Sequence, residues 1–239
     1  MIEVKNLSIS LGGHRILRNI SFKLGNRENL VILGRSGSGK TVLTKSLLGL
    51  FPPDDGSIVV DSVDLYRGSK IELKKIRESF AMVFQHAALL DSFTVYQNVA
   101  LPLYERGILD ESVIKERVLR SLQLVGLEET IDLYPAELSG GMRKRIGIAR
   151  ALVYEPEYLI FDEPVSGLDP ITAAETLFYI EAISKTQNAS ILTITHDLHS
   201  LPRLGNQVLF MDNGEMLYYG PISEITKVDD DTIRRYFQA

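Results

Sequence analysis

Apolar residues along this chain fall into short runs whose periodicity changes from strand-like to helix-like. Near the start, Ile2–Val4, Leu7–Leu11 and Ile20–Leu24 are β-like runs, and two glycines follow the second of them. The continuous apolar run Leu30–Leu33 is typical of a strand that is buried on both faces of a parallel sheet. The pattern therefore predicts an N-terminal antiparallel β-subdomain that leads into an α/β core.

The alternation of strand-like and helix-like segments continues beyond this run. Leu43, Leu47 and Leu50 recur at helical spacing, which predicts a helix directly after a glycine-rich turn. Further along, Tyr158–Phe161 and Ser190–Thr195 are strand-like. This order of elements predicts the fold class α/β.

A mainly helical segment, about residues 94–153, interrupts the alternation and is predicted to be an inserted helical subdomain. Thr94 and Gln97 fit a capping box at the start of its first helix. Asp110 fits the N-cap of a second helix, which Gly126 is expected to end. The apolar face of that second helix consists of Ile114, Val118, Leu122 and Val125.

The last third of the chain carries two further local signals. Pro170 suits the first turn of a helix. Asp212–Gly214, between two apolar runs, is a strong hairpin signal. Because no linker separates independent domains, we expect a single domain over residues 1–239, with the charged residues from about 226 to 239 as a C-terminal tail.

Composition narrows the class of protein. The chain has 239 residues and a formal net charge of −5, which argues against a general nucleic-acid binder. It has no cysteine, so disulfides and thiolate chemistry are excluded. Its start lacks the layout of a signal peptide, and no run reaches the ~20 apolar residues that cross a bilayer. We therefore expect a cytoplasmic protein.

The clearest chemical motif is G-x-x-x-x-G-K-[ST], which lies directly after the buried strand and before a helix. Glycines allow backbone N–H groups to approach phosphate oxygens, and the helix start adds the positive end of its dipole. Lys40 would reach the β- and γ-phosphates, while Thr41 would coordinate Mg²⁺. This glycine loop is the predicted phosphate site, or P-loop, and it consists of Gly34, Arg35, Ser36, Gly37, Ser38, Gly39, Lys40 and Thr41.

Polar residues at the ends of other apolar runs predict the rest of the site, because ligands in open α/β sheets bind at the carboxyl ends of strands. Asp162 ends a strand and is expected to hold magnesium through water. Glu163 is expected to polarise a water for attack on the γ-phosphate. His196 and Gln85 follow apolar runs in the same way, and the neutral amide of Gln85 would sense both magnesium and the attacking water.

Taken together, these motifs resemble the ATP-binding cassette (ABC) ATPase family. The most specific piece is Leu138–Met142, which matches the family's signature sequence and lies between the glycine loop and Asp162. The loop Ser166–Asp169 and then His196 follow in the family's order. The resemblance covers about residues 2–225 and implies a P-loop NTPase (RecA-like) core that binds and hydrolyses ATP with Mg²⁺.

The resemblance also implies that two copies of the chain pair head to tail around two ATP molecules. Ser139, Gly140 and Gly141 would close over the ATP that the partner's P-loop holds, and Asp169 is implied as a further ATP-binding residue. Leu11 stands where family members usually have an aromatic residue that stacks on adenine. We therefore expect weaker or less selective recognition of the base.

Within the family, Leu89–Val95 and Leu138–Arg145 resemble the Mla/MCE-type lipid-transport ATPases. The family resemblance itself implies a location at the cytoplasmic face of the membrane, on an integral membrane permease that would dock near Ala87–Val95. The lipid branch adds an MCE-type lipid-binding protein and an accessory subunit as partners. The alternatives are an ATPase subunit for amino acids, ions or lipoproteins, and a soluble ABC protein. A non-hydrolysing module is expected to lack Glu163 or His196, and both are present.

Overall fold

The computed structural model describes residues 1–238, which form two compact units. The first unit contains residues 1–80 and, after the intervening segment, the described residues from 190 onward. The second unit contains residues 81–189. Among the described residues, none of the helices combines the length and the apolar character that crossing a bilayer requires.

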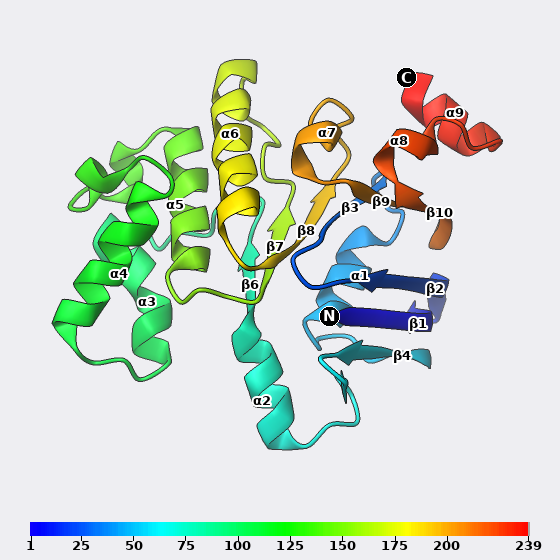
Figure 1. The fold of residues 1–239 in the computed structure, drawn as a ribbon, viewed down its shortest axis with the longest axis horizontal. Coiled ribbons are helices and arrows are strands. Elements are labelled where there is room, and N and C mark those ends of the chain that lie inside the picture. The colour runs from blue at the N-terminus through cyan, green and yellow to red at the C-terminus, as the bar shows by residue number, and fades with distance from the viewer. Residues whose placement is uncertain (239) are drawn as a thin grey trace. The chain divides into compact units, whose positions relative to one another are not determined.

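A four-stranded antiparallel sheet lies in the first unit, with the strand order β2-β1-β4-β5 (Figure 1). Alternate apolar residues of its long strands are buried, which is the pattern of a sheet with one face on the core. This confirms the predicted N-terminal antiparallel sheet. The strands are β1 (Ile2–Leu11), β2 (His14–Leu24), β4 (Asp55–Val60) and β5 (Val63–Asp64).

Two of the predicted strand boundaries are wrong. Ile2–Val4 and Leu7–Leu11 are parts of one strand, β1, because Asn6 takes a positive φ of 48° and lets the strand continue through an irregular step. The second strand begins at His14 rather than Ile20, since its polar first residues pair with the end of β1 across the tight turn at Gly12–Gly13.

The second sheet of this unit is built around β3 (Asn29–Gly34), with the strand order β10-β9-β3-β8. Strand β3 pairs in parallel with both β8 (Ser190–Thr195) and β9 (Gln207–Asp212). Leu30–Leu33 is at most 1% exposed, which confirms the predicted two-sided burial. The hairpin from β9 into β10 (Glu215–Pro221) also forms as predicted, with positive φ at both turn residues, Asn213 and Gly214.

Five helices belong to the described part of the first unit, and α1, α7 and α8 pack against its strands (Figure 1). Leu43 and Leu47 are buried in the first of them, as their spacing predicts, but Leu50 lies beyond its end and is 63% exposed. The helix ends earlier than predicted because Gly49 adopts a positive φ of 75°. The helices are α1 (Lys40–Leu47), α2 (Lys70–Ser79), α7 (Leu201–Leu204), α8 (Ile222–Ile225) and α9 (Asp231–Gln238).

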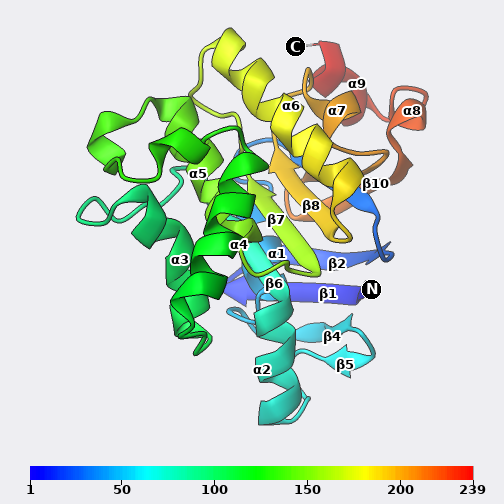
Figure 2. The ribbon, with the colours of Figure 1, turned by 60° about the vertical axis from the view of Figure 1, so that its left-hand side comes forward.

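The second unit is mainly helical, and α5 packs against α3, α4 and α6 (Figure 2). The predicted capping box at Thr94 and the N-cap at Asp110 are both present, and Pro170 occupies the first turn of α6. The four apolar residues predicted on one face of α4 and its end are fully buried. The elements are β6 (Phe80–Val83), α3 (Val95–Glu105), α4 (Glu111–Gln123), η1 (Glu128–Thr130), η2 (Pro135–Glu137), α5 (Gly140–Leu152), β7 (Tyr158–Asp162) and α6 (Pro170–Thr186).

Candidate functional site

The glycine loop joins the carboxyl end of β3 to the start of α1, as the sequence predicts. Gly34 has a φ of 156°, and a Cβ atom there would lie 2.2 Å from the carbonyl oxygen of Met211 on the neighbouring strand β9. Only glycine fits this approach. The sheet therefore fixes the loop at its first residue, directly before the start of α1, and a helix start is a favourable place for an anion.

Lys40 lies back across this loop. Its Nζ donates to the carbonyl oxygens of Gly34 at 2.6 Å and Arg35 at 2.9 Å. Arg35, Ser36, Gly37 and Thr41 are exposed, whereas Ser38 and Gly39 are buried. The loop therefore places the positive charge of Lys40 next to exposed loop residues, which suits the binding of a phosphate chain.

Contacts within the first unit support the loop from two sides. The N–H of Gly214, in the β9–β10 hairpin, donates to the carbonyl oxygen of Ser38 at 3.2 Å. On the β2 side, a Cβ on Gly39 would lie 2.7 Å from Leu17 Cδ2. Leu11 lies at the tip of the β1–β2 hairpin, where it is partly buried and pairs with His14.

His196 belongs to the same end of the same sheet. Leu33 in β3 pairs in parallel with Thr195 in β8. Gly34 directly follows Leu33, and His196 directly follows Thr195, so the two residues leave neighbouring strands at the same level. The His196 side chain is exposed. The strand register therefore brings the predicted histidine beside the first residue of the P-loop.

The acidic residues belong to the second unit. Asp162 ends β7 and Glu163 follows it with a positive φ of 49°, which turns the chain sharply after the strand. Both side chains are partly buried. Gln85 follows β6 and is exposed, and its Nε2 donates to Ser166 Oγ at 3.4 Å. The predicted catalytic amide is thus linked to the Ser166–Asp169 loop.

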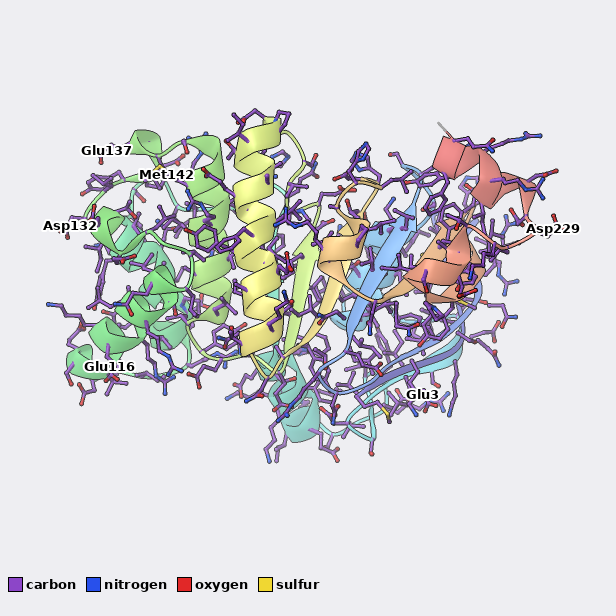
Figure 3. All side chains as sticks on the ribbon, turned by 45° about the horizontal axis from the view of Figure 1, so that its top comes forward. Glu3, Glu116, Asp132, Glu137, Met142 and Asp229 are labelled. Atoms are coloured by element: carbon purple, nitrogen blue, oxygen red, sulfur yellow. The ribbon has the colours of Figure 1, made fainter. Side chains whose placement is uncertain are left out.

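The signature sequence forms the start of α5. Ser139 is its N-cap, and its Oγ accepts a hydrogen bond from the N–H of Met142 at 3.2 Å. Gly140 is exposed, while Gly141 is buried so tightly that a Cβ there would lie 2.1 Å from Thr172 Cγ2. Figure 3 labels Met142 near this end of α5. The helix start therefore presents backbone donors to solvent through a glycine-lined turn.

Asp169 caps the next helix rather than pointing away from the protein. Its carboxylate accepts from the N–H groups of Ile171 and Thr172, both at 3.1 Å, and from Thr172 Oγ1 at 2.6 Å. These hydrogen bonds, the Thr172 hydroxyl first, lower the pKa of Asp169. Since Thr172 also packs on Gly141, the Ser166–Asp169 loop and the signature helix are held together within this unit.

The structure adds Lys144, to which none of the sequence motifs assigns a role. Its side chain, on the inner face of α5, donates from Nζ to the backbone carbonyl oxygens of Glu163, at 3.4 Å, and Ser166, in a shorter bond. Burial lowers its pKa, while the negative charge of Glu163 raises it. The signal in the sequence is a lysine three residues after the buried Gly141 on the same helix, which motif matching does not register.

We expect Lys144→Met to loosen these carbonyls, because methionine fills a similar volume but donates no hydrogen bond. Loss of a charged donor to these partly buried carbonyls should lower the free energy of unfolding by about 1–3 kcal/mol. Urea denaturation measures this change. Lys185→Met, at an exposed position of α6, removes only a surface ion pair with Glu181 and should change stability by less than about 1 kcal/mol. Equal effects of the two substitutions would contradict the anchoring role of Lys144.

The donors predicted for magnesium are the Thr41 hydroxyl, the Asp162 carboxylate and the Gln85 amide oxygen. Oxygen ligands of this kind suit Mg²⁺, which keeps several waters and is shared with substrate phosphates. No cluster of three or more His, Cys, Asp or Glu side chains suited to a metal ion occurs within residues 1–238.

The fold and the glycine loop define a P-loop nucleotide-binding protein. Residues 17–166 match the family model described as ABC transporter. The chain belongs to the ABC transporter family, and it is an ATP-binding, ATP-hydrolysing subunit of that family.

Curated relatives have two kinds of printed name. The chain is 39% identical to "Probable ribonucleotide transport ATP-binding protein mkl" of Mycobacterium leprae, over 98% of this chain and 68% of the relative. It is 40% identical to "Methionine import ATP-binding protein MetN" of Carboxydothermus hydrogenoformans, over 94% of this chain and 67% of the relative. The chain thus spans about two thirds of the length of these relatives.

Solved structures support the same fold. The chain is similar to cbiO1 of Clostridium perfringens, with a TM-score of 0.87 and 31% identity over 98% of this chain and 93% of that one. It is also similar to the ATP-binding cassette MJ0796, in a dimeric post-hydrolysis state bound to ADP and Pi, with a TM-score of 0.81 and 27% identity over 93% of this chain and 99% of that one. These matches confirm the predicted P-loop α/β fold.

Proposed function

We propose that this chain is the motor of a membrane transporter and that two copies pair head to tail around two ATP molecules. The observation that carries the proposal is the presence of two separate helix starts suited to an anion. One is the P-loop start of α1, and the other is the glycine-lined start of α5 at Ser139. The dimeric form of the similar cassette MJ0796 supports the pairing.

ATP binding is assigned mainly to the P-loop. Backbone N–H groups from Gly37 to Thr41 would hold the phosphates, and Lys40 Nζ would exchange its two carbonyl partners for β- and γ-phosphate oxygens. Leu11 would contribute apolar contact to the base. Thr41, Asp162 and Gln85 would hold Mg²⁺, which neutralises charge that develops on the phosphates.

Hydrolysis is assigned to three side chains. The Glu163 carboxylate would accept a proton from the attacking water, which requires that the carboxylate be ionised. His196 would donate a hydrogen bond toward the γ-phosphate, and Gln85 would orient the water through its amide. The hydrogen bond from Gln85 to Ser166 links this step to the Ser166–Asp169 loop.

The second copy would complete the site. Ser139, Gly140 and Gly141 would direct the donors at the start of α5 toward the ATP held by the partner's P-loop. Asp169 would act beside them by keeping the adjacent loop in place, since its carboxylate caps α6. ATP would therefore stabilise the closed dimer, and hydrolysis would release it, as a ligand that prefers one state requires.

Ser139→Arg tests this arrangement. The bulky cation would block the start of α5 without touching the P-loop, so ATP affinity at the P-loop should be unchanged while turnover falls about 10- to 100-fold. Steady-state ATPase assays and ATP titration measure the two quantities. Ser223→Arg, at an exposed serine of α8, is the control and should keep full turnover. Loss of ATP affinity in Ser139→Arg would contradict the assignment to the partner's site.

Closure of the dimer would drive a conformational change in a membrane permease. The chain would therefore lie peripherally at the cytoplasmic face of the inner or plasma membrane, bound to that permease. The segment Ala87–Val95 is proposed as the docking surface. Within it Leu90 is 43% exposed, and Phe84 just before it is 47% exposed. The backbone of this segment is fixed, because Arg150 donates to the carbonyl oxygens of Ala87 and Ala88.

Lipid is the proposed cargo, with an MCE-type lipid-binding protein and an accessory subunit as further partners. The support is the resemblance of Leu89–Val95 and Leu138–Arg145 to the lipid-transport branch. The printed names of the relatives point instead to ribonucleotides and methionine, which makes an importer of small polar molecules the second candidate. Mass spectrometry of lipids that co-purify with the permease complex separates the two. Phospholipid enriched over a matched permease complex supports the first, and its absence contradicts it.

A further inference from the structure

The last described helix, α9, contacts the loop that carries His196. Tyr236 Oη donates a hydrogen bond to the backbone carbonyl oxygen of His196 at 3.0 Å. The Tyr236 ring also packs edge-on against Phe210, with the ring centroids 5.0 Å apart. One side chain of α9 therefore touches both β9 and the residue that follows β8.

The positions of these contacts relate Tyr236 to the P-loop. Phe210 and Thr195 are the two residues that pair with Leu33, one from each strand beside β3. Leu33 is the residue directly before Gly34, where the P-loop begins. Tyr236 thus joins the two strands on either side of β3 at the level where all three approach the nucleotide site.

Helix α9 is itself held in place. Ile233 is 1% exposed, and Asp230 Oδ1 accepts from the N–H groups of Thr232, at 2.8 Å, and Ile233, at 3.0 Å. Arg234 forms ion pairs with Asp231 and Asp229, and Asp229 is labelled where the chain enters this helix in Figure 3. The buried Ile233 and the hydrogen bonds to Asp230 therefore hold α9, and with it Tyr236, in one position.

The loop after β8 depends on such contacts because it leaves the sheet at His196. Its next hydrogen bonds are local: the N–H of Asp197 donates to Thr195 Oγ1 at 3.0 Å, and Ser200 Oγ donates to the carbonyl oxygen of Asp197 at 3.1 Å. The hydrogen bond from Tyr236 comes from a helix about 40 residues further along the chain. It fixes the peptide plane of His196 and so the direction in which the imidazole leaves the backbone.

We propose that Tyr236 is a positioning residue for His196 and that α9 thereby sets the rate of ATP hydrolysis. This inference rests on the proposed role of His196 at the γ-phosphate. A histidine that acts there must be held in a narrow range of positions, since small displacements of a reacting group reduce turnover. ATP binding itself does not depend on this hydrogen bond, because the P-loop is held by β3, β9 and the β9–β10 hairpin.

Tyr236→Phe tests the inference in the full chain, because it keeps the ring on Phe210 and removes only the hydroxyl. We expect kcat for ATP to fall about two- to tenfold, the range of one net hydrogen bond, with KM unchanged. The ¹H–¹³C resonance of the His196 imidazole, assigned with His196→Gln in nucleotide-free protein, should shift. Tyr218→Phe is the matched control, since Tyr218 Oη donates to the Pro221 carbonyl oxygen at 2.9 Å, and it should change neither quantity.

Two results would overturn the inference. Wild-type kcat with an unshifted His196 resonance in Tyr236→Phe would show that the hydroxyl does not position the histidine. A fall in kcat with an unshifted resonance and a lower melting temperature would show a structural role only. His196→Ala separates this inference from the proposed function: if that variant turns over ATP at the wild-type rate, the assigned role of His196 is wrong as well.

Discussion

Glu163→Gln should keep ATP affinity and lose most turnover, with the rate falling about 100- to 1,000-fold. Glutamine has nearly the same shape as glutamate but does not accept a proton from water, so ATP would bind and close the dimer without being hydrolysed. The variant should therefore accumulate as a dimer when ATP and Mg²⁺ are present. Analytical ultracentrifugation with and without ATP measures this change, and a phosphate-release assay measures the rate.

Glu157→Gln is the matched control for this substitution. Glu157 is exposed and lies just before β7 begins, so the same change of charge there should leave turnover and association unaltered. Wild-type turnover in Glu163→Gln would remove Glu163 from the catalytic step. A monomer with bound ATP but no hydrolysis would retain the catalytic role and contradict ATP-driven pairing.

Lys40→Ala should weaken ATP binding by about 100-fold, because the cation that the loop directs at the phosphates is lost. The contacts of Lys40 with Gly34 and Arg35 involve only backbone carbonyls, and the loop keeps its support from Met211 and Gly214. The variant is therefore expected to fold. Titration with a fluorescent ATP analogue measures the affinity, and circular dichroism checks the fold.

Lys45→Ala provides the comparison within the same helix. Lys45 is exposed in the last turn of α1, where its Nζ lies 5.7 Å from the centroid of the Phe51 ring, away from the loop. Its replacement should leave ATP affinity unchanged. If Lys40→Ala binds ATP as tightly as Lys45→Ala does, the P-loop assignment is wrong.

Local signals predicted the parts of the fold that depend on neighbouring residues. Thr94, Asp110 and Pro170 mark helix starts because caps and fixed φ angles act within one turn. Asn213 and Gly214 mark the hairpin because the tight turn needs positive φ at both positions. The candidate site was visible for a related reason, since its motifs must place backbone donors and acids at strand ends.

Elements and contacts that depend on residues far away in the sequence could not be predicted from local patterns. Helix α2 buries only Ile76, which leaves it without a continuous apolar face, and the apolar pattern of the sequence therefore does not predict it. The bulge at Asn6 breaks the alternation of β1, yet pairing with two neighbouring strands keeps that strand continuous. Lys144 and Tyr236 act through backbone carbonyls about 20 and 40 residues away, and no spacing in the sequence encodes such contacts.

The shared ATP site is tested most directly by mixing two inactive variants, Lys40→Ala and Ser139→Arg, and measuring radiolabelled ATP retained by the dimer on gel filtration. In a mixed dimer, one site combines the intact P-loop of the Ser139→Arg copy with the intact signature of the Lys40→Ala copy. The account predicts that the dimer fraction of the mixture contains ATP, whereas Ser139→Arg alone binds ATP only as a monomer and Lys40→Ala alone binds ATP weakly. Retention no greater than the sum of the separate variants would contradict a site built from two copies.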